Sequence, residues 1–171
     1  MIAKDFVKWV YPAAKRVSDV SPIFTTAKAA LESGWGDSRI GYNLFGVTKG
    51  SSWRGPTRLV TTTEYFSTPN KRFLSPEVVL SVECVGANKY KYKVKRLFRD
   101  YSSLEECLRD YLTILQKPHF SDAWPYRKDP ITYVTKLQDD VGLKYATAPN
   151  YVQVMCQLFK KVERIVSEEG L

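Results

Sequence analysis

The segment over residues 23–47 constrains the fold most, because it starts with helical periodicity and continues as a glycine-rich loop. Apolar residues recur in its first half at steps of three and four, which predicts an amphipathic helix opened by a Ser-Pro pair. Gly34 and Gly36 then predict the helix end, since glycine accepts the left-handed backbone that commonly follows one. We therefore expect a helix over residues 21–33 and an ordered loop over residues 34–55.

Glu32 falls in the last turn of this predicted helix. The exposed carbonyl groups of a last turn disfavour a negative charge, and Leu31, Trp35 and Phe45 nearby in the sequence are apolar. We expect this carboxyl group to resist ionisation, as a general acid working near neutral pH requires. The helix position alone leaves open that Glu32 is an ordinary solvated glutamate.

Several separated motifs occur in the same order as in a known family, and Glu32 belongs to the first of them. They occupy residues 27–38, 43–46, 53–55, 62–64, 98–111 and 144–152. These motifs include AALESGWGDS, NLFG, W-x-G and a strand with T-x-E. Through them the chain resembles the peptidoglycan N-acetylglucosaminidases of glycoside hydrolase family 73. That family includes flagellar and autolysin-type enzymes of bacteria. The resemblance covers nearly the whole chain, and the shared order of the motifs makes it specific.

The resemblance implies a lysozyme-like α+β fold that is mainly helical and carries a small antiparallel β-lobe. We expect one glucosaminidase domain over residues 1–171, with the β-lobe at about residues 57–98 and no cofactor. The implied activity is that of an endo-β-N-acetylglucosaminidase, a cell-wall hydrolase that cuts the glycan strand of peptidoglycan. Such hydrolysis needs only carboxyl groups and sugar-binding side chains.

The same resemblance assigns three catalytic candidates. Glu32 is the proton donor, Glu64 matches the second acid on the T-x-E strand, and Tyr145 matches a tyrosine that orients substrate or water. Strand alternation leaves open that Glu64 is a surface glutamate, and Tyr145 could equally pack in the core. For Glu64 we favour activation of water in direct displacement over assistance by the acetamido group of the substrate.

Six further residues are candidates for contacts to the sugar. Aromatic side chains in loops either fill the core or provide the stacking surface that a sugar cleft requires. The candidates are Trp35, Asn43, Phe45, Trp53, Tyr65 and Thr147.

The rest of the chain predicts more helices and a small sheet. Strands are expected at residues 57–66, 78–85 and 89–94, because β-branched and aromatic residues gather there around a Gly-Ala-Asn turn. Alternation along the first strand places Thr62 and Glu64 on the same face. The further helices are expected at residues 4–18, with a kink or restart at Pro12, and at 103–115, 129–142 and 151–165.

The third predicted strand alternates lysines with apolar residues. Its outward face consists of Lys89, Lys91, Lys93 and Lys95, in a chain of net charge +8. Basic surfaces attract polyanions, so we expect these lysines to bind acidic wall polymers. No specific nucleic acid is expected, although the same lysines with neighbouring aromatics could form a nucleic-acid surface.

Other catalytic classes find little support. His119 is the only histidine, so a zinc site lacks ligands and none is expected. Cys107 with His119 lacks the motif of a cysteine peptidase. The cysteines, Cys84, Cys107 and Cys156, are expected to be free and mostly in the core, with a disulfide pair left open. A muramidase of the same fold and a non-catalytic wall-binding module remain as alternatives.

The sequence indicates part of the protein's cellular location. No apolar run is long enough to cross a bilayer, and the first residues do not resemble a signal peptide. We expect action at the cell wall, in the periplasm or outside the cell, with export by another route or with a leader already removed.

Overall fold

The computed structural model describes residues 1–17, 19–139 and 150–171. The chain divides into two compact units. The helical unit comprises Met1–Phe45 and Ser102–Leu171, and the sheet unit comprises Gly46–Tyr101. This confirms an α+β chain that is mainly helical with a small antiparallel sheet.

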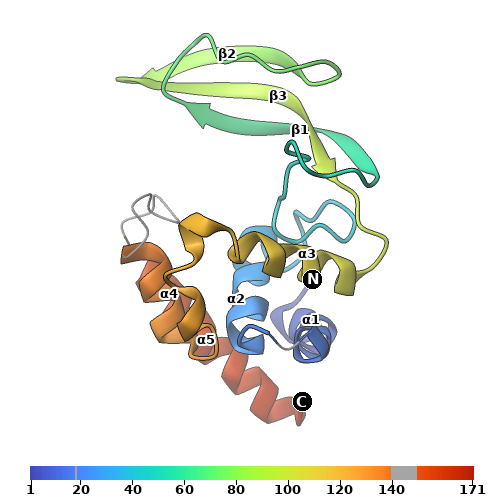
Figure 1. The fold of residues 1–171 in the computed structure, drawn as a ribbon, viewed down its shortest axis with the longest axis vertical. Coiled ribbons are helices and arrows are strands. Elements are labelled where there is room, and N and C mark those ends of the chain that lie inside the picture. Colours follow the sequence, from blue (N-terminus) through green and yellow to red (C-terminus); the bar gives the residue numbers. More distant parts are fainter. Residues whose placement is uncertain (18, 140–149) are drawn as a thin grey trace. The chain divides into compact units, whose positions relative to one another are not determined.

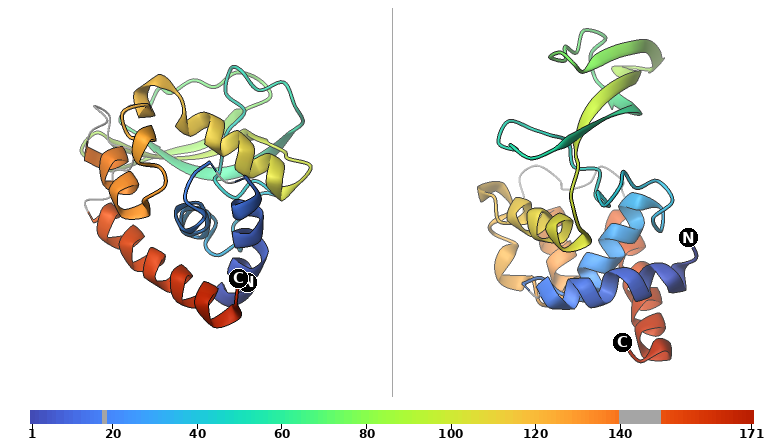
Figure 2. Two further views of the ribbon diagram at one scale, coloured as in Figure 1. Left: turned by 60° about the horizontal axis from the view of Figure 1, so that its bottom comes forward. Right: turned by 90° about the vertical axis from the view of Figure 1, so that its right-hand side faces the viewer.

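The helical unit contains five α-helices in its described part, and α2 lies among the others (Figures 1 and 2). Packing against α1, α4 and α5 buries α2 along most of its length. The helices are α1 (Ala3–Val17), α2 (Pro22–Ser33), α3 (Leu104–Leu115), α4 (Pro130–Asp139) and α5 (Tyr151–Glu169), with short 3-10 turns at Pro118–Phe120 and Trp124–Tyr126. All five predicted helices are confirmed, while the expected end of α4 near residue 142 lies outside the described residues.

Both ends of α2 follow the predicted signals. The Ser21 hydroxyl accepts a hydrogen bond from the Phe24 amide, and Pro22 occupies the first turn. Gly34 adopts the left-handed conformation with φ +56°, and its amide donates to the Ala30 carbonyl. The helix therefore ends at Ser33, one residue beyond the candidate acid, with Gly34 as its cap.

One detail of the helices differs from the predictions. α1 continues through Pro12 without a restart. On α5, Phe159 is buried and packs against Phe24, whereas Leu158 is half-buried.

The sheet unit is built on three antiparallel strands in the order β1-β3-β2 (Figure 1). The strands are β1 (Thr57–Phe66), β2 (Val78–Gly86) and β3 (Lys89–Arg99). Tyr92 and Val94 of β3 are fully buried, whereas the lysines between them are exposed, as the alternation predicted. Glu64 lies opposite Tyr92 in the register and so shares the covered face of the sheet.

The W-x-G motif has a packing explanation within the sheet unit. The Trp53 indole N–H donates to the Pro56 carbonyl at 2.9 Å, and Tyr101 and Arg99 pack on the ring. A Cβ atom at Gly55 would lie only 2.7 Å from Cε2 of this fixed ring. Only glycine therefore fits two residues after the tryptophan.

We predict that Gly55→Ala lowers the free energy of unfolding by about 1–3 kcal/mol, because a fixed ring has to move to admit the methyl group. Urea denaturation of the purified protein measures this change. Gly86→Ala is the matched control, since a Cβ there meets its nearest atom at an ordinary 3.7 Å. Equal stability of both variants would contradict the packing explanation.

Candidate active site

Glu32 lies in the last turn of α2, and its surroundings differ from the prediction. Its side chain is 39% exposed and forms an ion pair with Lys28, one turn earlier, at 2.5 Å. Phe45 instead stacks on Tyr111, with ring centroids 3.8 Å apart. The predicted apolar surroundings of the Glu32 carboxyl group were therefore wrong, because a basic partner on the same helix face reaches it first.

Lys28 is a buried cation. Its side chain is only 6% exposed, and its ammonium group lies 5.0 Å from the centre of the Tyr151 ring at the start of α5. Burial lowers the pKa of Lys28, and the neighbouring Glu32 carboxyl group opposes this shift. Glu32 is consequently the exposed member of a pair whose other member is held inside the helical unit.

Trp35 follows the helix end with a left-handed backbone, φ +56°. Its ring packs edge-on against Phe6 and lies beneath the Lys161 ammonium group at 4.8 Å. It also lines a groove of about 410 Å³ between α2 and α5, together with Leu31 and Leu158. The ring is partly exposed, so it both packs and offers an edge to a ligand.

Two other candidates for sugar contacts lie inside the helical unit. Asn43 is 1% exposed, and its backbone pairs with Ile40 in a short bridge. Phe45 is 8% exposed in its stack on Tyr111. Their burial supports the packing role that the sequence analysis left open for loop aromatics.

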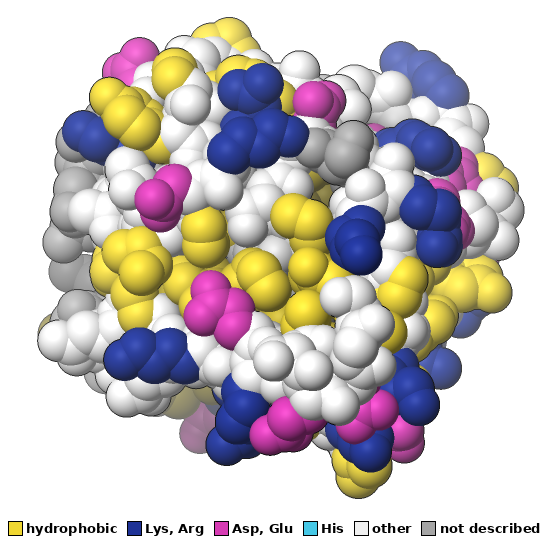
Figure 3. Space-filling view, turned by 90° about the horizontal axis from the view of Figure 1, so that it is seen from below, with side chains coloured by type: hydrophobic (Ala, Val, Ile, Leu, Met, Phe, Trp, Pro, Cys, Tyr) yellow, Lys and Arg dark blue, Asp and Glu magenta, His cyan; other side chains and the backbone are white. Residues whose placement is uncertain are grey.

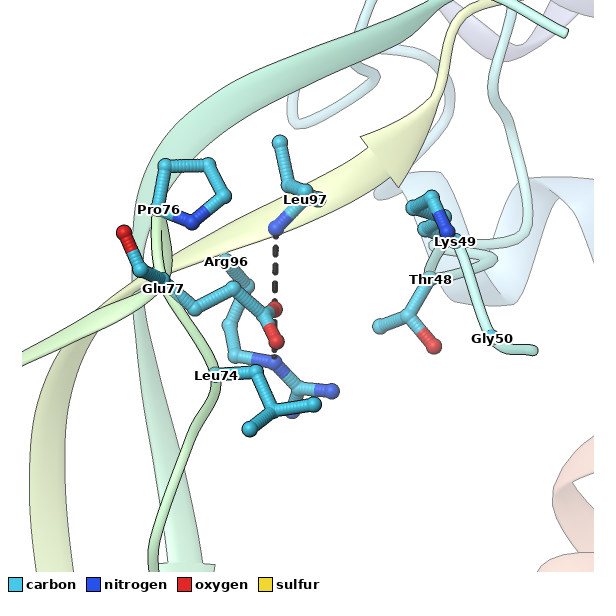
Figure 4. Close-up of a pocket in the computed structure, with 9 residues that line it drawn as sticks. Thr48, Lys49, Gly50, Leu74, Pro76, Glu77, Arg96 and Leu97 are labelled. Atoms are coloured by element: carbon cyan, nitrogen blue, oxygen red, sulfur yellow. Dashed lines mark hydrogen bonds and ion pairs between the residues drawn. The ribbon is translucent and has the colours of Figure 1, made fainter. Parts of the chain in front are cut away.

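Glu64 is anchored by an arginine on the neighbouring strand. Arg96 donates from Nη1 to Glu64 at 2.5 Å and from Nε to Glu77 at 2.7 Å. Glu77 also accepts the Leu97 amide at 3.0 Å (Figure 4), and the Arg96 guanidinium lies over the Phe73 ring. These partners raise the pKa of Arg96 against the opposing effect of burial. Glu64 is thus a partly buried carboxylate in a fixed network of the sheet unit.

The other candidates are divided between the exposed face of the sheet unit and the part of the chain outside the description. Tyr65 is 54% exposed, and the Lys89 ammonium group lies 5.1 Å from its ring centre. Trp53 is partly exposed beside Arg99. Tyr145 and Thr147 lie outside the described residues.

The buried thiol of Cys107 does not suit nucleophilic catalysis. Burial raises the pKa of Cys107 to about 12, so the reactive thiolate is scarce near neutral pH. His119 is exposed and packs on Phe120. Cys84 is exposed and Cys156 partly so, and all three cysteines are free, which means that only Cys107 fulfils the prediction of a core position.

Comparison with known proteins identifies the family. The glucosaminidase family model, described as mannosyl-glycoprotein endo-beta-N-acetylglucosaminidase, matches residues 8–164. The chain belongs to the glucosaminidase family. This family membership makes the chain a glycoside hydrolase and confirms the resemblance seen in its motifs.

Relatives and solved structures agree with the family. The peptidoglycan hydrolase FlgJ of Salmonella typhimurium is 32% identical over 175 residues, covering 94% of this chain and 46% of the relative. The solved glycoside hydrolase domain of that FlgJ superposes with a TM-score of 0.73 at 29% identity, covering 99% of this chain and 94% of that domain. A probable N-acetylmuramidase of Lactococcus lactis subsp. lactis is 27% identical over 159 residues, or 85% of this chain and 30% of the relative. The chain therefore spans less than half the length of these curated relatives and has a lysozyme-like glycoside hydrolase fold.

Sequence reasoning missed three residues around the two candidate acids, namely Lys28, Arg96 and Glu77. Lys28 could have been found from its position four residues before Glu32 on a helix, where opposite charges meet. Arg96 interrupts the row of lysines on β3 and shares the covered face with Val94, which marks a buried cation. Glu77 gives no signal in the sequence, because its position depends on the fold of the loop before β2.

We predict that Arg96→Met lowers the free energy of unfolding by about 1–3 kcal/mol at pH 7, since Glu64 and Glu77 lose their shared cation. Urea denaturation of the purified protein at pH 7 measures this change. Arg58→Met, which breaks a more exposed pair with Asp100 at 3.2 Å, is the control and should cost less. A deficit no larger than that of Arg58→Met would contradict the network.

Proposed function

We propose that this glucosaminidase hydrolyses the glycan strand of bacterial peptidoglycan as an endo-β-N-acetylglucosaminidase. The observation that carries the proposal is the match to the glucosaminidase family over residues 8–164, in a chain that presents Glu32 at an exposed helix end beside the buried Lys28. The printed names of the relatives, which are peptidoglycan hydrolases, support the substrate. We further propose that residues 1–171 act as one glucosaminidase domain, to which both units contribute.

In the proposed mechanism Glu32 donates a proton to the oxygen of the leaving sugar. The Glu32 carboxyl group is engaged by Lys28, so substrate binding has to weaken this contact before the proton is transferred. A sugar ring that covers Glu32 and excludes water would have this effect. Lys28 then holds the carboxylate that remains after the transfer.

Glu64 is the proposed base in this mechanism. The hydrogen bond from Arg96 fixes the direction of its carboxyl group, which suits a group that activates water for direct displacement. Tyr145 is proposed to orient the substrate or the water. Trp35, Asn43, Phe45, Trp53, Tyr65 and Thr147 remain the proposed sugar contacts, and Tyr65 and Trp53 offer the more accessible rings.

A muramidase is the second candidate function, because one relative carries that name. It would cut at the other of the two alternating sugars of the same strand. Mass spectrometry of fragments released from purified peptidoglycan separates the two. New reducing ends of N-acetylglucosamine support the glucosaminidase, and reducing ends of muramic acid support the muramidase.

We predict that Glu32→Gln lowers turnover of peptidoglycan about 10²–10⁴-fold, the usual loss for a positioned acid. The fold should survive, because the glutamine carbonyl can still accept a hydrogen bond from Lys28. Glu105→Gln is the matched control, since Glu105 also pairs with a cation, Arg16, on the helical unit. Near-parental clearing of a peptidoglycan suspension by Glu32→Gln would contradict the assignment.

We propose action at the cell wall and binding of acidic wall polymers by Lys89, Lys91, Lys93 and Lys95, all of which are exposed. None of the described helices has the length and apolar character needed to span a membrane. On the face shown in Figure 3, basic side chains are scattered with acidic ones among them, whereas β3 sets four lysines in a row. A row of like charges is the arrangement that attracts a linear polyanion.

We predict that changing Lys91, Lys93 and Lys95 together to Gln weakens attachment to isolated walls and lowers its dependence on salt. Cleavage of a short, neutral oligosaccharide should stay within about twofold, since exposed charges act on binding by screened attraction. Co-sedimentation with walls at several salt concentrations gives the first result, and product analysis the second. Tight, salt-sensitive binding to random oligonucleotides without wall binding would favour a nucleic-acid surface instead.

A further inference from the structure

The sheet unit contains a hollow to which Arg96 and Glu77 contribute. Its volume is about 380 Å³, and it is lined by residues 48–50, 74–77 and 96–97. In Figure 4, Thr48 and the tip of the Arg96 guanidinium face each other across this hollow, with Leu74 beside Arg96. The loop of residues 48–50 is fixed there, because the Lys49 amide donates to the Leu97 carbonyl at 2.8 Å.

Three hydrogen-bond donors at the hollow are unused. Arg96 commits Nε to Glu77 and Nη1 to Glu64, which leaves Nη2. Within the described ranges, neither this Nη2 nor the Thr48 hydroxyl nor the Lys49 ammonium group makes a hydrogen bond or ion pair. Partly buried donors without partners gain most from a ligand that supplies acceptor oxygens.

The Lys49 ammonium group is the feature of the lining that suits an anion. Glu77 is the acidic residue of the hollow, and its Oε2 already accepts from Arg96 and from the Leu97 amide. Arg96 is paired with Glu77 and Glu64, whereas Lys49 has no acidic partner among the described residues. A carboxylate would be bound by a charge-assisted hydrogen bond at this position.

Apolar side chains complete the lining. Leu74 is 87% exposed, an unusual state for a leucine, and Pro76 and Leu97 lie in the same lining. A ligand that brings methyl groups next to its carboxylate would cover this surface. A short peptide with alanine residues and free carboxyl groups has that chemistry, whereas a phosphate polymer lacks the methyl groups.

We propose that this hollow binds the short acidic peptide that peptidoglycan carries on its muramic acid, with a carboxylate at Lys49 and Thr48. The proposal rests on the proposed function, because it assigns a site for another part of the same substrate. Arg96 connects the hollow to Glu64, so a peptide bound there would place its sugar strand on the side of the proposed base. The site therefore determines preference for peptide-bearing strands and takes no part in the bond cleavage.

Steady-state kinetics on two matched substrates test this proposal. One substrate is a glycan oligosaccharide that carries its peptides, and the other is the same oligosaccharide after an amidase has removed them. The parental protein should show a lower KM for the peptide-bearing strand. Lys49→Gln and Thr48→Val should each raise that KM about fivefold, leaving kcat and the KM for the bare strand unchanged.

Lys160→Gln is the charge-matched control, since Lys160 is exposed on α5 of the helical unit. It should leave both KM values unchanged. Binding of a synthetic acidic peptide to the parental protein, measured by calorimetry in the absence of glycan, gives a readout independent of cleavage. Lys49→Gln and Thr48→Val should weaken this binding, and Lys160→Gln should not.

The outcomes separate the two proposals. A parental protein that cleaves neither strand contradicts the proposed function, whereas cleavage of both strands with equal KM contradicts only the peptide site. An equal rise in KM for the peptide-bearing and the bare strand in Lys49→Gln would also overturn the peptide site. Binding of a phosphate polymer in place of the peptide, lost in Lys49→Gln, would assign the hollow to the wall polymer instead.

Discussion

The end of helix α2 is the constraint on which the candidate site depends. The Gly34 and Trp35 amides both donate to the Ala30 carbonyl, and the Ser33 hydroxyl donates to Ala29 while accepting from the Gly36 amide. These bonds satisfy backbone groups that a buried helix end would otherwise leave without partners. They also stop the helix directly after Glu32, so that its carboxyl group emerges at the surface of an otherwise buried element.

The two candidate acids share one design, in which a cation with little exposure holds a more exposed carboxyl group. Lys28 holds Glu32 from within α2, and Arg96 holds Glu64 from the adjacent strand. Both cations are shielded from solvent, so the pairs are screened less by salt than surface pairs are. Lys28 and Glu32 lie one turn apart on the same helix, whereas Arg96 bridges Glu64 on the neighbouring strand and Glu77 before β2.

Local signals in the sequence predicted most of the fold and the family. The cap at Ser21, the glycines after Glu32 and the alternation along β3 each determine local structure within a few residues, and all three were confirmed. The start of α3 shows what such signals leave out: Ser103 accepts from the Glu106 amide, whereas the Glu106 carboxyl group accepts from the Ser102 amide. A side chain chooses between neighbouring donors by geometry that the sequence pattern does not contain.

The surroundings of the acids could not be predicted, because they depend on contacts between distant residues. Arg96 and Glu64 are separated by 32 positions, and their contact requires the register of β1 with β3. The burial of Lys28 requires α5 to place Tyr151 against it. Helical periodicity gives the face on which a residue lies, but it does not tell whether a lysine there extends to solvent or stays inside.

The central claim is that Glu32 and Glu64 act as an acid and a base in one direct displacement. Its most direct test is the anomeric configuration of the new reducing end, followed by NMR immediately after cleavage of a defined glycan oligosaccharide. The account predicts inversion, and loss of this cleavage in Glu64→Gln. Retention of configuration, or full activity of Glu64→Gln, would contradict it.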